Sequence, residues 1–130
     1  MEFDKIMLDK ALKLLSDRLK LNNAPSYNLI VCGGSALIAA NLISRRTKDV
    51  DIVALGDEAL NLIDPEPLPD ELLKAAKQVG DTLGLKEGWL NNEPSQGENG
   101  LFKHKLPKGL VSRLMKKEYG KKLKVYFVDR

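Results

Sequence analysis

The chain has 130 residues, of which 43% are hydrophobic and 30% are charged, the composition of one ordinary water-soluble domain. Its single cysteine, Cys32, excludes an intrachain disulfide and a cysteine-based zinc cluster. No apolar run reaches the roughly 20 residues that span a bilayer, and the acidic N-terminal residues are unlike a signal peptide. We therefore expect one cytoplasmic domain over residues 1–130, with no membrane partner.

Two helices and two strands are predicted in the first part of the chain. Residues 3–21 form an amphipathic pattern, because four leucines fall on one helical stripe: Leu8, Leu12, Leu15 and Leu19. The turn residues of 22–26 end this helix, and 27–32 (YNLIVC) predicts a strand buried on both faces. A Gly-Gly turn then leads to a helix over 35–45, and 49–55 (DVDIVAL) predicts a second strand.

The second part of the chain predicts two further helices and a last strand. The prolines of 64–69 indicate a rigid linker, after which Asp70 is expected to cap a helix that ends at Gly84. Residues 87–100 read as a long loop and 107–120 as a short helix ending at Gly120. Residues 122–129 (KLKVYFVD) are rich in β-branched and aromatic side chains, which favours a strand.

Charge is distributed unevenly along the chain, whose net charge is +3. Residues 1–100 carry 11 basic and 16 acidic side chains, a balance of −5, whereas residues 101–130 carry 10 and 2, a balance of +8. A basic segment of this kind indicates either a phosphate- or nucleic-acid-binding surface or simply a solvated face.

Two aspartates stand in the strand predicted after the glycine turn. Asp49 and Asp51 are two residues apart, so their side chains point to the same face of a sheet, with Cα atoms about 7 Å apart. Two carboxylates side by side repel each other, and a divalent cation would offset that repulsion. Mg²⁺ takes carboxylate, phosphate and water oxygens as ligands. The pair therefore predicts a metal site.

The glycine turn supplies the features of an anion site. Gly33 and Gly34 let the backbone approach a ligand closely, and Ser35 stands at the start of the predicted helix. N–H groups at a helix N-terminus suit a phosphate, and the Ser35 hydroxyl adds a donor. Each motif alone is common. Their combination predicts a nucleotide held between the turn and a metal-binding aspartate pair.

This combination resembles the signature of the polymerase β-type nucleotidyltransferase superfamily. The segment GGSALIAANLISRRTKDVDIVAL, with the later GWLNNEP, LPKGLVSRL and LKVYFVDR, is similar to a family of small bacterial and archaeal nucleotidyltransferases. That family is related to the toxins of abortive-infection toxin–antitoxin pairs. The resemblance covers about residues 27–130 and implies an α/β (α+β) nucleotidyltransferase fold, with helices packed on a small mixed sheet.

The resemblance also implies roles for particular residues. Gly34 and Ser35, next to Gly33, would hold the nucleotide phosphates, and Asp49 and Asp51 would hold Mg²⁺ or Mn²⁺. The superfamily usually has a third carboxylate on a neighbouring strand, for which Asp129 is the candidate in the last strand. Members of the family continue past this strand into a helical segment that contains a lysine. This chain ends at Arg130, so we expect a domain shortened at its C-terminus or one without that layer.

Other polar residues near the aspartates have two interpretations each. Arg45, Arg46 and Lys48 could neutralise a triphosphate or could be a basic helix C-terminus favoured by the helix dipole. Thr47 could orient Asp49 or cap the corner.

Trp89 either stacks on a base, with Asn91 and Asn92 contacting the nucleotide, or anchors its loop on the core, which is the commoner fate. His104 has no partner at a metal-ligand spacing and is interpreted as a surface residue.

The function predicted from these features is Mg²⁺-dependent transfer of a nucleoside monophosphate from an NTP to an acceptor hydroxyl. The acceptor stays open among tRNA, protein and small molecules, and an antitoxin protein and a homodimer are further expected partners. The alternative is a non-catalytic module of the same fold that binds a protein or RNA through its basic C-terminal third. A dinucleotide-binding protein is ranked low, because its Gly-x-Gly-x-x-Gly fingerprint is missing.

Overall fold

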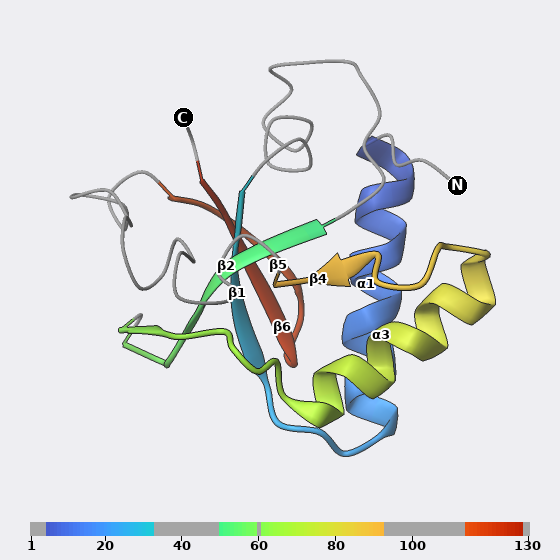
Figure 1. Cartoon of the computed structure of the whole chain (residues 1–130), viewed down its shortest axis with the longest axis horizontal. Coiled ribbons are helices and arrows are strands. Elements are labelled where there is room, and N and C mark those ends of the chain that lie inside the picture. Colours follow the sequence, from blue (N-terminus) through green and yellow to red (C-terminus); the bar gives the residue numbers. More distant parts are fainter. Residues whose placement is uncertain (1–4, 33–49, 60, 93–113, 129–130) are drawn as a thin grey trace.

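The computed structural model describes residues 5–32, 50–59, 61–92 and 114–128, which form a mixed sheet with two helices (Figure 1). The elements follow one another in this order: α1 (Lys5–Leu21), β1 (Tyr27–Cys32), β2 (Val50–Gly56), β3 (Leu62–Ile63), α3 (Asp70–Leu83), β4 (Leu90–Asn91), β5 (Leu114–Gly120) and β6 (Leu123–Val128). The predicted mixed sheet with packed helices is therefore confirmed. The helix predicted over 35–45 lies outside the described residues.

The sheet has the strand order β3-β2-β1-β6-β5, with β4 paired to β2 as well. Strand β1 is antiparallel to β2 and parallel to β6, and β5 and β6 form an antiparallel hairpin. The short strand β4 runs parallel to β2. Strands distant in sequence thus lie side by side at the centre of the domain.

Helices α1 and α3 pack on one face of this sheet and enclose the core (Figure 1). The four leucines of the α1 stripe are fully buried, as predicted. In α3 the apolar residues Leu72, Ala76, Val79 and Leu83 recur at helical spacing, and the first three are buried while Leu83 is partly buried against the core. From the sheet, Leu29, Val31, Ile52, Val125 and Phe127 join the same cluster. Apolar periodicity in the sequence therefore identified both helices and the faces they bury.

The sequence predicted the C-terminal end of α3 correctly but not the residue that caps its N-terminus. Gly84 ends the helix in a left-handed conformation (φ 70°), as expected for a glycine at this position. Asp70 does not cap the helix, since the helix already includes it and Pro69 occupies the capping position. Asp70 and Glu71 lie instead in the first turn, where carboxylates interact favourably with the helix dipole.

The helix predicted over 107–120 is wrong where the structure describes it, because Leu114–Gly120 is strand β5. Side chains alternate along this strand: Tyr119 is buried and Met115 and Lys117 are partly buried, while Lys116 and Glu118 are exposed. The segment contains Leu, Met, Lys and Glu, which have high helix propensity, and this composition favoured a helix although the burial of the side chains alternates as in a strand. The predicted loop 87–100 likewise contains a short strand, β4.

No helix among the described residues is both long enough and apolar enough to span a bilayer.

Candidate functional site

Asp51 lies near the start of β2 on the sheet face opposite the helices. Its neighbours Val50 and Ile52 are fully buried in the core beneath α1 and α3, while Asp51 itself is partly exposed. Val50 and Ile52 thus point into the layer opposite Asp51, as the alternation of side chains along a strand requires. The second carboxylate of the predicted pair, Asp49, lies outside the described residues.

A one-residue shift in the β1–β2 register decides which face Asp51 takes. Ile30 pairs with Ala54, but the next residue, Val31, pairs with Ile52, so Val53 is an extra residue in β2. With strict alternation from Leu55, which packs against the core, Asp51 would also have pointed toward the helices. The bulge reverses the alternation and turns the carboxylate to the other face, a known use of bulges beside functional sites.

The end of β1 lies directly beside Asp51. Cys32, the last residue of β1, is the partner of Asp51 in the antiparallel ladder. Neighbouring strands are about 4.8 Å apart, so the chain leaves β1 within one strand spacing of the carboxylate. Gly33 is the next residue in the sequence. The register therefore puts Cys32, the residue that precedes the Gly-Gly-Ser motif in the sequence, beside the strand that carries Asp51.

Strand β4 lies alongside β2 at the same level. Val50 pairs with Leu90 and Asp51 pairs with Asn91 in a parallel ladder, and the Val50 N–H donates to the Trp89 carbonyl at 2.6 Å. Leu90 is buried in the core. Asn91 therefore shares with Asp51 the face turned away from the helices. From the sequence, Asn91 was a candidate nucleotide contact in the loop around Trp89, but no local pattern indicated its pairing with Asp51.

Most of the other predicted site residues cannot be placed, because they lie outside the described residues: Gly33, Gly34, Ser35, Arg45, Arg46, Thr47, Lys48 and Asp129. Strand β6, which precedes Asp129 in sequence, is separated from β2 by β1. The strands next to β2 at the level of Asp51 are β1 and β4. Asp129 as a third carboxylate stays a prediction.

The oxygen donors on this face suit a hard divalent cation. Asp51 offers a carboxylate and Asn91 a carboxamide oxygen, both of which are ligand types of Mg²⁺ and Mn²⁺. Within the described ranges, no cluster of three or more His, Cys, Asp or Glu side chains is present. A metal bound here would therefore need donors besides Asp51, from Asp49, from Asn91 or from the nucleotide.

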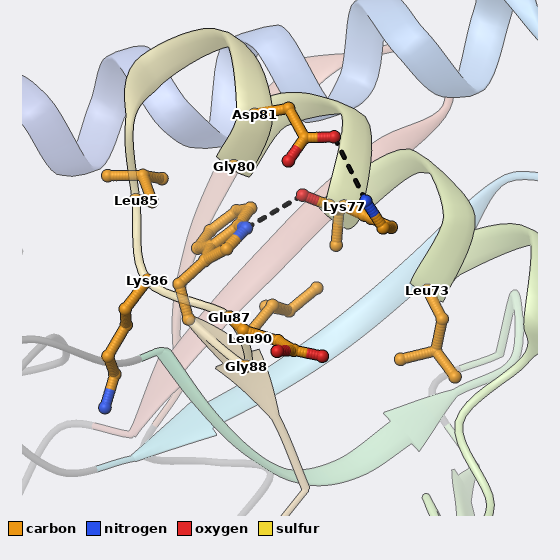
Figure 2. Close-up of a pocket in the computed structure, with 11 residues that line it drawn as sticks. Leu73, Lys77, Gly80, Asp81, Leu85, Lys86, Glu87, Gly88 and Leu90 are labelled. Atoms are coloured by element: carbon orange, nitrogen blue, oxygen red, sulfur yellow. Dashed lines mark hydrogen bonds and ion pairs between the residues drawn. The ribbon is translucent and has the colours of Figure 1, made fainter.

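Trp89 anchors its segment on α3, which confirms the core interpretation of this residue. Only 2% of its surface is exposed, and its indole Nε1 donates to the Ala76 carbonyl at 2.8 Å (Figure 2). Gly80 makes room for the ring, since a Cβ there would lie 3.3 Å from two indole atoms. The neighbouring Asn92 is also buried, and its side-chain Nδ2 donates to the Pro65 carbonyl at 2.8 Å.

A hollow of about 460 Å³ lies around Trp89, between α3 and residues 85–90 (Figure 2). Its walls include Leu73, Leu85 and Leu90, and Lys77 and Asp81 form an exposed ion pair at its rim (3.2 Å). Leu90 points toward the helices and Asn91 to the opposite face. The hollow and Asp51 are therefore on different sides of the sheet.

Taken together, the mixed sheet, the helices on one face and the aspartate beside the end of β1 fit a small nucleotidyltransferase-type fold. Residues 6–130 match the model of the family described as "Nucleotidyltransferase of unknown function (DUF6036)", and the chain belongs to that family. Searches of curated proteins and of solved structures returned no significant match. The predicted nucleotidyltransferase family is thus confirmed.

Proposed function

We propose that this protein transfers a nucleoside monophosphate from an NTP to an acceptor hydroxyl, with Mg²⁺ or Mn²⁺ as the cofactor. The acceptor oxygen forms a bond to the α-phosphorus, and the bond from that phosphorus to the β-phosphate oxygen breaks. Pyrophosphate leaves, and the hydroxyl proton passes to a base at the site. Family membership supports a transferase of this class, with an NTP as its substrate.

The residues of the chain divide into two groups in this proposal. Asp49 and Asp51 hold the metal, which when bound supplies positive charge to the phosphates. Gly33, Gly34 and Ser35 bind the phosphate tail through backbone N–H groups and the serine hydroxyl. Arg45 and Lys48 join the second group by neutralising the triphosphate, and Thr47 joins the first by orienting Asp49.

One observation carries the proposal. The antiparallel pairing of Cys32 with Asp51 puts the residue preceding the Gly-Gly-Ser motif beside the metal-binding strand. A nucleotide bound by the motif would then reach the carboxylate without any rearrangement of β1 and β2. The core side chains on either side of Asp51 hold that strand in place, because Val50 and Ile52 are fully buried.

Calorimetric titration of the four NTPs tests this proposal, with Mg²⁺ in one series and EDTA in the other. The wild type should bind at least one NTP only with Mg²⁺, and the variant Asp49→Ala/Asp51→Ala should lose that binding. Asp81→Ala is the matched control. It makes the same aspartate-to-alanine change at an exposed position of α3, away from the proposed site. Metal-dependent binding that persists in the double variant would contradict the proposal.

A second candidate function is RNA or protein binding by the same fold without catalysis. It is favoured by the basic C-terminal third, where Lys116 and Lys121 are exposed on the β5–β6 hairpin. RNA binding that weakens with salt but ignores the Asp49→Ala/Asp51→Ala change would support this alternative. The resemblance to abortive-infection toxins adds the proposal that an antitoxin is the protein partner.

A further inference from the structure

The pairing of β4 with β2 brings a side-chain amide to the proposed metal site. Asp51 and Asn91 are direct partners in a parallel ladder although they are 40 residues apart in sequence. Both are partly exposed, while the preceding residues on their strands, Val50 and Leu90, are buried on the helix side. The two polar side chains therefore project from the same face, about one strand spacing (~4.8 Å) apart.

Anchored neighbours on both sides hold Asn91 in this position. Trp89 is fastened to α3 by its indole N–H and to β2 by its carbonyl, which accepts from Val50. Asn92 is fastened to the Pro65 carbonyl by its buried amide. The Asn91 Nδ2 itself donates to the Gly88 carbonyl at 3.2 Å. That bond restrains the carboxamide plane and hence the direction of its oxygen.

We propose that Asn91 is a further ligand of the metal site, whose side-chain oxygen helps to hold the divalent cation that Asp51 binds. The inference rests on the proposed function. A carboxamide is neutral and does not accept a proton, so Asn91 contributes a ligand without adding negative charge and without acting as the base. The site then carries less negative charge than one with a carboxylate at this position, and it binds free metal more weakly.

The experiment measures Mn²⁺ binding to the full chain without nucleotide, by electron paramagnetic resonance of the free ion. Asn91→Ala should weaken Mn²⁺ binding about tenfold, in the range seen when groups that support a metal site are removed. Asn91→Asp should tighten it about tenfold, because it adds a charge at the site. Asn91→Ala decides between a ligand and a merely structural role, because a carboxylate at position 91 would attract the cation even if the native amide did not contact it. A structural role predicts unchanged Mn²⁺ binding in Asn91→Ala as long as β4 keeps its place.

Asn23→Asp is the matched control for added charge. Asn23 is exposed and has a left-handed backbone (φ 54°), which aspartate tolerates as well as asparagine does. It precedes β1 at the end remote from Cys32, so its charge lies beyond the screening length of about 8 Å at physiological salt. Mn²⁺ binding of this variant should stay within about twofold of the wild type.

The outcomes separate this inference from the proposed function. If Asp49→Ala/Asp51→Ala abolishes Mn²⁺ binding but both Asn91 variants bind like the wild type, the role of Asn91 is overturned and the aspartate site stands. If the aspartate variant binds Mn²⁺ normally, both proposals fail. If the wild type binds none without nucleotide, the role of Asn91 is overturned and the NTP titration alone decides the proposed function. Fluorescence of Trp89, the only tryptophan of the chain, checks that β4 keeps its place in each variant.

Discussion

The hydrogen bond between Tyr119 and Asp9 should account for a measurable part of the stability of the domain. The Tyr119 hydroxyl donates to Asp9 Oδ1 at 2.8 Å, and Lys117 Nζ lies 3.4 Å from the same oxygen. These contacts fasten β5 to α1 across more than 100 residues of sequence. Tyr119 is 9% exposed, so its hydroxyl is largely shielded from water.

Tyr119→Phe removes this bond and almost nothing else. A hydrogen bond to a charged acceptor contributes about 1.5–3 kcal/mol when it is buried. The Asp9 side chain is 38% exposed, and water competes for it, so we expect a loss of about 1–2 kcal/mol. Urea unfolding followed by Trp89 fluorescence gives the free energy of unfolding from the midpoint and slope.

Two further variants decide whether this reasoning holds. Tyr126→Phe removes the same hydroxyl from a partly exposed side chain of β6 and should cost under about 0.5 kcal/mol. A double-mutant cycle of Tyr119→Phe with Asp9→Ala should give a coupling energy of about 1 kcal/mol. A loss in Tyr119→Phe no larger than that in Tyr126→Phe, or a coupling energy near zero, would refute the assignment.

Three more predictions concern alkaline pH, the β5–β6 turn and the bulge in β2. Burial and the bond to Asp9 raise the pKa of Tyr119 above its ordinary value near 10, so its contribution to stability is complete below pH 10 and is lost as pH rises further. The stability difference between wild type and Tyr119→Phe should therefore shrink between pH 10 and 11 in urea titrations. Gly120→Ala should destabilise by about 1–3 kcal/mol, because its φ of 156° disfavours a side chain and its Cβ would also collide with the Ser16 hydroxyl, and adding Ser16→Ala should restore only part of the loss in the same assay. Deletion of Val53 should preserve Mn²⁺ binding, because strict alternation back from Leu55 would then keep Ile52 and Val50 toward the helices and Asp51 on the opposite face. Loss of Mn²⁺ binding in this variant would contradict the assignment of Val53 as the extra residue of β2.

Local patterns in the sequence were sufficient for several elements. The stripe of α1, the strand Tyr27–Cys32 and the stop of α3 at Gly84 each depend on residues within one or two turns of one another. Apolar spacing decides a helix face, and a glycine in the left-handed region ends a helix, whatever the rest of the chain does. The Gly-Gly-Ser and Asp-x-Asp motifs, from which the family was predicted, are likewise short local patterns.

Strand β5 could not be predicted in this way, because its partners are distant in sequence. Its residues favour a helix by propensity, yet Tyr119 and Lys117 both reach Asp9 on α1, and the strand pairs along its length with β6. Tertiary contacts of this kind outweigh differences of a few tenths of a kcal/mol per residue in local preference.

The order of the residues is enough to identify the Gly-Gly-Ser and Asp-x-Asp motifs and to predict an α/β fold around them. The way the strands assemble, in contrast, decides which side chains lie beside Asp51. Its face depends on one extra residue in β2, and its neighbour Asn91 arrives through a parallel pairing across 40 residues. Register between strands is set by the burial of whole faces against the helices, a property of the assembled sheet that no short stretch of sequence contains.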